Sequence, residues 1–230
     1  MTGSRWSLTR RRRGHHGVRV TLASGCPRCA APVTGHTGSW ACADHGTIVP
    51  LWRPARAVYD AFAEHVARSS GFPTLAPWPL TPGWVVSDFG YVGDEGREPR
   101  AVFVTCAGPS EPDGVVELTV VSEEPGVGLA ARVAGVTRTD PGGEIGEGPP
   151  HVKVRIDGHP VSLWGVSTSA ADNDFDRSVF AGEAHGRWLW LVLKPASAAL
   201  LLNEEWVLHD LSDLGPELID LPFGGSPPAW

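Results

Sequence analysis

The spacing of three cysteines and one histidine near the start of the chain constrains its fold more than any other feature. These residues form two pairs, each with two residues inside the pair, and twelve residues separate the pairs. Pairs of this kind allow two tight turns to present four side chains to one metal ion. Thiolates and an imidazole suit zinc, and four protein ligands fill its tetrahedral shell. The sequence therefore predicts one structural zinc ion with the ligands Cys26, Cys29, Cys42 and His45.

Other interpretations of these residues explain less. His36 is the main rival to His45 as the fourth ligand. A disulfide is uncommon in a cytoplasmic protein, and a thioredoxin-type redox pair would give Cys42 and His45 no role. A catalytic zinc keeps one coordination position open, whereas four protein ligands close the shell. Cys106 lies on an apolar stretch far from the motif, so we expect a buried structural thiol there.

The order of patterns along the chain indicates four segments. At 230 residues the chain is long enough for one sizeable core with a small module attached to it. Short connections, without regular alternation of strands and helices, favour antiparallel pairing and an α+β fold. The predicted segments are a disordered basic tail (1–19), a zinc-ribbon-like module (20–52), a helix and proline-rich linker (53–83) and a mainly antiparallel β domain with a C-terminal helix (84–230).

One helix is expected between the module and the β domain. Within residues 53–70, Val58, Phe62 and Val66 recur every four residues and so share one helix face. Pro54 suits a first helical turn, and a glycine and a proline shortly after residue 70 end the pattern.

Runs of apolar and β-branched residues between Gly, Pro and Asp turns predict the strands of the β domain. His185-Gly186 predicts a tight hairpin between the last two strands. The last strand is apolar on both faces, which indicates a central strand covered on both sides. A helix over Pro195–Glu205, with Leu200, Leu201 and Leu202 on its apolar side, is the expected cover. The predicted strands are Trp84–Phe89, Ala101–Thr105, Val115–Ser122, Leu129–Val136, Val152–Ile156, Val161–Val166, Ser178–Glu183 and Arg187–Leu193.

The net charge of −7 is unevenly distributed. Five arginines lie in the first 13 residues, so the rest of the chain carries a charge of −12. So acidic a body is a poor match for a phosphate backbone, and we expect it to bind no nucleic acid. No run approaches the ~18 apolar residues of a membrane-spanning helix. The stretch 22–26 resembles a lipoprotein signal but lacks an apolar segment before it, so we expect a cytoplasmic protein.

Two weaker patterns were weighed against ordinary structural roles. Asp172, Asp174 and Asp176, with Glu183 at the twelfth position, partly match a calcium loop. Arg177 occupies the position where that loop requires glycine, so a solvated turn is the expected structure.

The second pattern is Gly126-x-Gly128-x-x-Ala131, which follows a predicted strand as a dinucleotide fingerprint would. Gly135 cuts short the helix that such a fingerprint should open, and we expect a strand instead. No G-x-S-x-G, P-loop or H-E-x-x-H sequence is present, and the other histidines show no paired spacing. The ten tryptophans could line a ligand groove, although core and loop anchors are the more common use of such residues.

Several short motifs occur together in the chain: Cys26-Pro27-Arg28-Cys29, His45-Gly46, Pro50-Leu51-Trp52-Arg53-Pro54, Pro77-Trp78-Pro79-Leu80, Gly83-Trp84, Glu123-Glu124-Pro125-Gly126, Gly182-Glu183-Ala184, Trp188-Leu189-Trp190 and Leu221-Pro222-Phe223-Gly224. With them, the chain from about residue 20 to its end resembles an uncharacterised family of actinobacterial proteins. That resemblance implies a soluble bacterial protein with a zinc-ribbon-like N-terminus and a domain of unknown function. Members sometimes carry the label phosphotransacetylase, which no residue here supports.

The filled metal shell and the lack of a nucleophile–base set favour a non-enzymatic binding or adaptor module with an unidentified protein or small-molecule partner. The alternative is an enzyme or small-ligand binder, acyl transfer included, whose pocket in the β domain is lined by tryptophans and acids.

Overall fold

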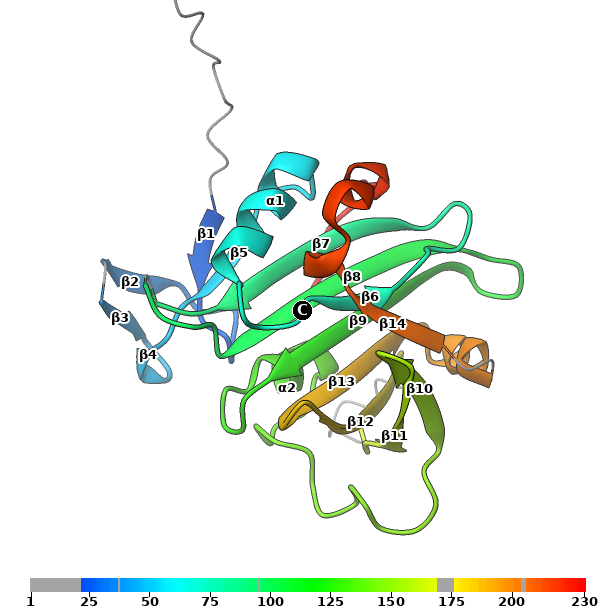
Figure 1. Ribbon diagram of the computed structural model, residues 1–230. Helices are drawn as coiled ribbons and strands as arrows, with labels where there is room; N and C mark the ends of the chain where they lie inside the picture. Colours follow the sequence, from blue (N-terminus) through cyan, green and yellow to red (C-terminus); the bar gives the residue numbers. More distant parts are fainter. Residues whose placement is uncertain (1–21, 37, 95, 169–175, 204–205) are drawn as a thin grey trace, which may run out of the picture.

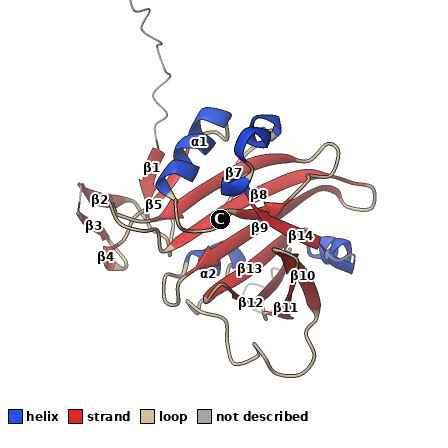
Figure 2. Ribbon diagram, viewed as in Figure 1, coloured by secondary structure: helices blue, strands red, loops and turns tan. Residues whose placement is uncertain are grey.

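The computed structural model describes residues 22–36, 38–94, 96–168, 176–203 and 206–230. Within them the protein is mostly β, with few short helices (Figures 1 and 2). A large mixed sheet, mainly antiparallel, forms the body, and a small sheet near the N-terminus carries the cysteine and histidine residues. The predicted mainly antiparallel pairing is confirmed, but the fold is mostly β rather than α+β.

The large sheet has eleven strands in the order β1-β5-β7-β8-β9-β13-β12-β11-β10-β14-β6, and the small sheet has the order β2-β3-β4. Among the described strands, β10 and β14 form the parallel pair. The bounds are β1 (Leu22–Gly25), β2 (Val33–His36), β3 (Ser39–Cys42), β4 (Gly46–Ile48), β5 (Leu51–Pro54), β6 (Leu75–Pro77), β7 (Val85–Val92), β8 (Ala101–Ser110), β9 (Gly114–Glu123), β10 (Val152–Ile156), β11 (His159–Gly165), β12 (Ser178–Ala184), β13 (Arg187–Lys194) and β14 (Trp206–Asp210).

Two tight turns fix the register of two hairpins. In the β12–β13 turn, His185 and Gly186 have φ angles of 53° and 72°, and in the β10–β11 turn Asp157 and Gly158 have φ angles of 50° and 78°. Positive φ at both central residues defines the turn that matches the twist of paired strands. The hairpin predicted at His185-Gly186 is therefore confirmed.

The large sheet curls, so that its far end, β14 and β6, lies over the middle strands β8 and β9 (Figure 1). The main core fills the space inside the curl, where aliphatic side chains from opposite parts of the sheet meet. Leu189, Leu191 and Leu193 of β13 point into this core. Trp190 and Val192, on the other face of the same strand, join a second core. The prediction of a central strand covered on both sides is therefore confirmed.

The helix that covers the second core was predicted wrongly as a strand. Residues within Leu129–Val136 form the helix α2 (Leu129–Ala134), and all of its apolar side chains are buried against β9 and β13. Alanine-rich sequence favours a helix, and Gly128 and Gly135, with φ angles of 83° and 70°, mark its two ends. The short length hid the helical period from sequence analysis.

The other two helix predictions also need correction. The helix expected over 53–70 is α1 (Tyr59–Arg68), because residues 51–54 belong to β5. Its buried face comprises Ala61, Phe62 and His65, whereas Val58 is 43% exposed. The segment expected as the helix Pro195–Glu205 contains the 3-10 helix η1 (Ala196–Asn203). There Ala198 and Leu202 reach the main core, whereas Leu200 is 70% exposed.

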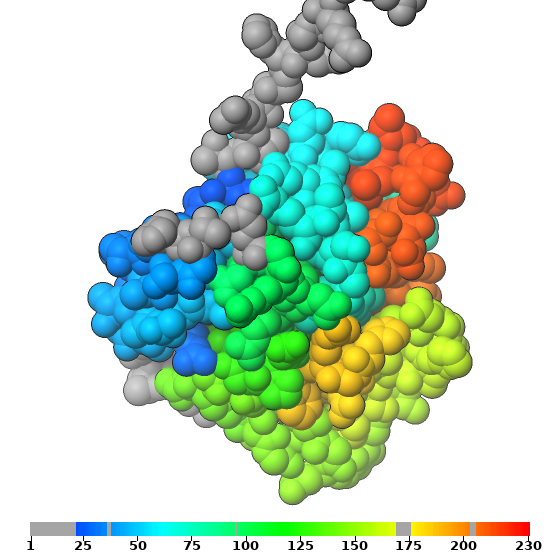
Figure 3. Space-filling model, turned by 60° about the vertical axis from the view of Figure 1, so that its left-hand side comes forward, coloured from blue at the N-terminus to red at the C-terminus, as the bar shows by residue number. Residues whose placement is uncertain are grey.

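The segment 20–52 is divided between the two sheets. β1 and β5 pair with each other along their whole length, and β5 also pairs with β7. Both ends of the segment therefore belong to the large sheet. The part between them, β2 to β4, forms the small sheet, which stands at one side of the molecule beside residues of the large sheet (Figures 1 and 3).

Some predicted features lie outside the described residues, namely the basic tail (1–19) and two aspartates of the calcium-like pattern, Asp172 and Asp174. In the part of the chain that the structure describes, no helix has the length and apolar character needed to cross a membrane.

Candidate metal centre

Two turns bring together the four residues that the sequence predicts as ligands. Cys26 follows β1 directly, and Cys29 lies in the turn that leads to β2. Cys42 ends β3, and His45 lies in the hairpin turn before β4. Gly46, with a φ angle of 65°, provides the left-handed backbone conformation that closes this turn.

The ligand atoms are spaced as the corners of a tetrahedron around one ion. Nδ1 of His45 lies 3.6 Å from Sγ of Cys26, 3.4 Å from Sγ of Cys29 and 3.6 Å from Sγ of Cys42. Zn–S and Zn–N bonds of about 2.3 and 2.05 Å at a tetrahedral angle place sulfur and nitrogen about 3.6 Å apart. Sγ atoms of Cys29 and Cys42 are 3.5 Å apart, near the roughly 3.8 Å edge of the same tetrahedron. All four ligand atoms lie within 4.8 Å of one another, so the cluster can hold a metal ion such as zinc.

The protons of this cluster are tightly coupled. Burial, followed by hydrogen bonds from Cys42 and Cys26, raises the pKa of Cys29 to about 12. Burial also acts on Cys42, but hydrogen bonds from His45 and from nearby backbone amides outweigh it and lower the pKa of that thiol to about 6. Three sulfurs this close cannot all carry negative charge without a compensating cation. A divalent metal ion would supply that positive charge.

Two arginines attach the cysteine turn to the body of the protein. Arg28, between the first two cysteines, donates from Nε to the carbonyl of Val127 at 3.0 Å and from Nη2 to the carbonyl of Gly126 at 2.6 Å. Arg132 of α2 donates from Nη1 to the carbonyl of Cys26. Its guanidinium also lies 4.8 Å from the ring centre of Trp230.

A buried carboxylate caps the N-terminus of α2. Glu123 is completely buried, and its Oε2 accepts hydrogen bonds from the amides of Leu129 at 2.9 Å and Ala130 at 3.2 Å. Its other oxygen, Oε1, is buried without a hydrogen-bond partner among the described residues. Burial is the main cause that raises the pKa of Glu123 to about 8, and the amide hydrogen bonds oppose the shift only in part.

The same contacts argue against a dinucleotide-binding site at Gly126-x-Gly128-x-x-Ala131. Such a site needs free amides at a helix N-terminus to receive phosphate oxygens. Here the first amides of α2 are already bonded to Glu123, and the amide of Gly126 donates to Asp140 at 2.7 Å. An added Cβ at Gly128 would lie 3.2 Å from Cγ of Arg28, so the glycine serves close packing against the cysteine turn.

The structure also places the other residues that the sequence singled out. Cys106 is 1% exposed in the main core, which confirms the buried thiol, and burial raises its pKa to about 12. Asp176 pairs with Arg177 at 2.6 Å and with Lys194 at 3.6 Å. The backbone of His36 ends β2, paired with Ser39.

Tryptophans gather at one further place. Trp78, Trp84 and Trp206 line a cavity of about 270 Å³ together with prolines 77 and 79. The rings of Trp84 and Trp206 meet edge to face, with their centres 6.1 Å apart. Trp190 is instead completely buried in the second core.

Sequence analysis did not find Arg132, because it reaches the cysteine turn across 106 residues. It also missed Glu123, because the helix that this carboxylate caps was expected to be a strand. Arg28 offered a local signal, since it stands between two predicted ligands. The fold and the cluster together define a mostly β protein with a Cys3His cluster at its small N-terminal sheet that could bind a metal ion.

Comparison with known families gives a match that covers most of the chain. The chain matches DUF6758, a family of unknown function, over residues 20–230, and it belongs to this family. Searches of curated proteins and of solved structures find no match.

Proposed function

We propose that the protein is a non-enzymatic binding module in which Cys26, Cys29, Cys42 and His45 hold one structural zinc ion. The observation that carries the proposal is the spacing of 3.4–3.6 Å between Nδ1 of His45 and the three sulfurs. These distances are the sulfur–nitrogen edges expected of a zinc tetrahedron.

A structural role follows from the number and the placement of the ligands. Four protein ligands leave no position for a substrate or a reactive water. Cys26 and Cys42 are buried, and His45, which is exposed, closes the cluster on the solvent side. The ion would thus fix the turn that carries Arg28, and through Arg28 it would hold the small sheet against residues 126–127.

Elemental analysis of the full chain, purified under reducing conditions, tests this assignment. We expect one zinc per chain in the wild type and in Cys106→Ser, and none in Cys42→Ser. Cys106→Ser is the matched control, because it removes a buried thiol that is not part of the cluster. His36→Ala is expected to keep the ion, whereas His45→Ala is expected to lose it. A wild-type protein without metal, or a His36→Ala variant without metal, would refute the assignment.

The second candidate function is an enzyme or small-ligand binder that uses the tryptophans of the β domain. The cavity lined by Trp78, Trp84 and Trp206 is the observation in its favour, because flat aromatic walls suit an apolar ligand. A screen of metabolites by thermal shift and turnover separates the two functions. Turnover of any substrate that Trp206→Leu abolishes would favour the second.

The proposed setting is the cytoplasm, with a protein or small-molecule partner rather than nucleic acid. The chain outside its first 13 residues is strongly acidic, which disfavours a phosphate backbone. The cysteines of the described region are free thiols, as a metal cluster in a reducing compartment requires.

A further inference from the structure

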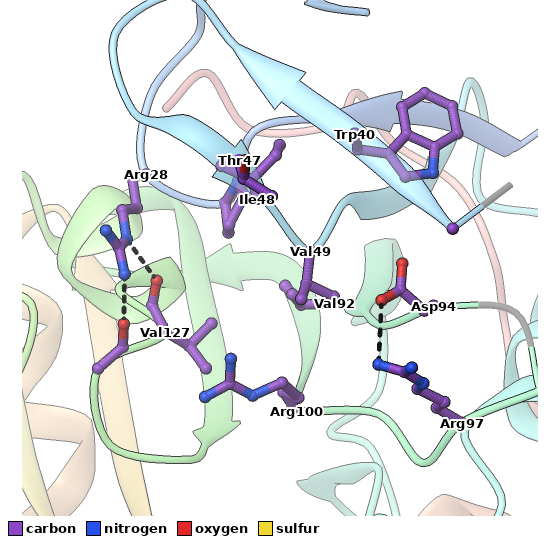
Figure 4. A pocket seen from close by; sticks show the side chains of 13 residues that line it. Arg28, Trp40, Thr47, Ile48, Val49, Val92, Asp94, Arg97, Arg100 and Val127 are labelled. Atoms are coloured by element: carbon purple, nitrogen blue, oxygen red, sulfur yellow. Dashed lines mark hydrogen bonds and ion pairs between the residues drawn. The ribbon is translucent and has the colours of Figure 1, made fainter. Parts of the chain in front are cut away.

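A cavity of about 340 Å³ lies where the small sheet meets the large one. One wall comes from the small sheet, with Trp40 and Ile48, and from the turn between Cys26 and Cys29, with Arg28. The other comes from the connection between β7 and β8 and from the loop before α2. Figure 4 shows Trp40 and Arg28 on opposite sides of this space, with Val49 and Val92 between them. Its volume is at the lower end of the ~300–1,000 Å³ typical of small-molecule sites.

The lining of this cavity is positively charged, although the chain as a whole is acidic. The lining contains three arginines, Arg28, Arg97 and Arg100, and one carboxylate, that of Asp94. Arg97 is 79% exposed and lies 4.0 Å from Asp94, which is a loose contact (Figure 4). Arg28 donates to neutral carbonyls, which leave its charge uncompensated.

Arg100 retains donors for a ligand. Its Nε contacts Glu124 at 2.8 Å, and both side chains of this pair are close to half exposed. Exposed pairs of this kind contribute little free energy, so a bound anion can compete for the guanidinium. No other hydrogen bond of the Arg100 side chain occurs within the described residues, so its terminal nitrogens have no protein acceptor there.

The remaining lining offers a flat apolar surface. Trp40 packs edge to face on Trp52, with ring centres 5.3 Å apart, and Nε1 of Trp52 donates to the carbonyl of Gly93 at 3.0 Å. These contacts hold the indole of Trp40 in place above the valines of the cavity (Figure 4). A preformed aromatic wall beside a group of arginines suits a ligand with an apolar body and an acidic end.

We propose that this cavity binds a small organic anion, a carboxylate or phosphate joined to an aromatic or aliphatic body. The acid group would lie beside Arg97, with Arg100 adding positive charge to the same cavity, and the body would rest on Trp40 and Val92. The inference rests on the proposed zinc site, because the ion would fix the turns that carry Arg28 and Trp40.

Calorimetric titration of the full chain, purified under reducing conditions, tests it with three probes that share a phenyl ring. Phenyl phosphate and phenylacetate differ in the acid group, and benzyl alcohol is the neutral control. We expect at least one anion to bind at least about tenfold more tightly than benzyl alcohol. The anion that binds more tightly identifies the acid group that the site prefers.

Two variants with the same change of charge locate the binding. Arg97→Glu is expected to raise the Kd of the tighter anion at least about tenfold, and Arg56→Glu is expected to leave it within about twofold. Arg56 is exposed and does not line the cavity. Equal effects of the two variants, or equal binding of all three probes, would refute the inference.

Zinc analysis of the same samples separates the two proposals. A protein with one zinc that binds neither anion better than benzyl alcohol refutes the cavity assignment and leaves the zinc site standing. A protein without zinc that binds an anion through Arg97 supports the cavity and refutes the zinc site. A protein that lacks both zinc and anion binding refutes both.

Discussion

The two sheets of this protein are held together by different means. Trp190 and Leu191 of the large sheet are completely buried, and they belong to two apolar cores on opposite sides of one strand. Among the described residues of β2, β3 and β4, Cys42 is the buried one, and the others are half-buried or exposed. The large sheet can therefore rely on the burial of apolar surface, whereas the small sheet cannot.

This difference explains where the metal cluster is found. Below ~40 residues a domain rarely buries enough apolar surface to fold without metals or disulfides. The small sheet is far below that size, so we infer that coordination of an ion supplies most of its stability. Hydrogen bonds of Arg28 and Arg132 attach the cysteine turn to the body, and Trp40 packs edge to face on Trp52 of β5.

The largest expected difference between the two sheets is their response to a zinc chelator. Chelation is expected to abolish protection from amide hydrogen exchange in β3 and β4, because their ordering depends on the ion. The strands β8, β9 and β13 should retain their protection. Mass-spectrometric exchange before and after chelation measures both. Protection in β3 that survives complete removal of the ion would contradict the comparison.

The next effect concerns the core of the large sheet. Trp190→Ala is expected to lower the free energy of unfolding by about 3–5 kcal/mol, because the side chain is completely buried between β13 and α2. Zinc content per folded chain should not change. Urea unfolding followed by circular dichroism gives the magnitude, and a loss below roughly 1 kcal/mol would show that the core lies elsewhere.

A third, smaller effect depends on pH. The pKa of Glu123 is raised to about 8 in the folded protein, so the folded state keeps a proton that the unfolded state releases above pH ~4.5. This contribution to stability is complete at low pH and is lost as the pH rises through 8. Glu123→Gln removes it and preserves an oxygen for the amides of α2. We expect the wild type to lose roughly a few kcal/mol relative to Glu123→Gln between pH 5 and 8.

Urea midpoints at pH 5, 6.5 and 8 measure that difference. The pKa of Asp88, raised to about 6 mainly by burial, and that of His65, lowered to about 3 by burial, also make stability depend on pH. Both residues are present in the two proteins, so their contributions cancel in the difference. If the urea midpoints of the two proteins change with pH in parallel, Glu123 ionises normally in the folded state.

The smallest expected effect concerns the junction between the sheets. Arg132→Ala leaves the carbonyl of Cys26 without its guanidinium donor, which costs about 1–3 kcal/mol for a buried group. We expect this loss to appear as faster release of zinc to a chelator, with a smaller change in the unfolding of the large sheet. Arg56→Ala is the control, since that side chain is exposed. Equal rates of zinc release from the two variants would show that the contacts of Arg132 do not stabilise the cluster.

Sequence reasoning succeeded where neighbouring residues decide the structure. The two ligand pairs and the turn at His185-Gly186 depend on backbone geometry over a few residues. It failed at α2, where six residues are too few to show a helical period and where the capping carboxylate belongs to the preceding strand. It also began the linking helix at residue 53, although Arg53 and Pro54 belong to β5 and pair with β1.

By itself, the sequence determined which three cysteines can share an ion, with His45 or His36 as the fourth ligand. It also determined where the chain reverses at His185-Gly186, and that β13 has two apolar faces. Only the tertiary structure decided what surrounds the cluster. Arg132 reaches Cys26 across 106 residues, and Arg28 reaches Val127 across 99. The cavity with Trp40 and Arg97 likewise joins segments from both sheets. Such contacts depend on how the whole sheet curls and on loop closure over long stretches, and no short-range spacing encodes either.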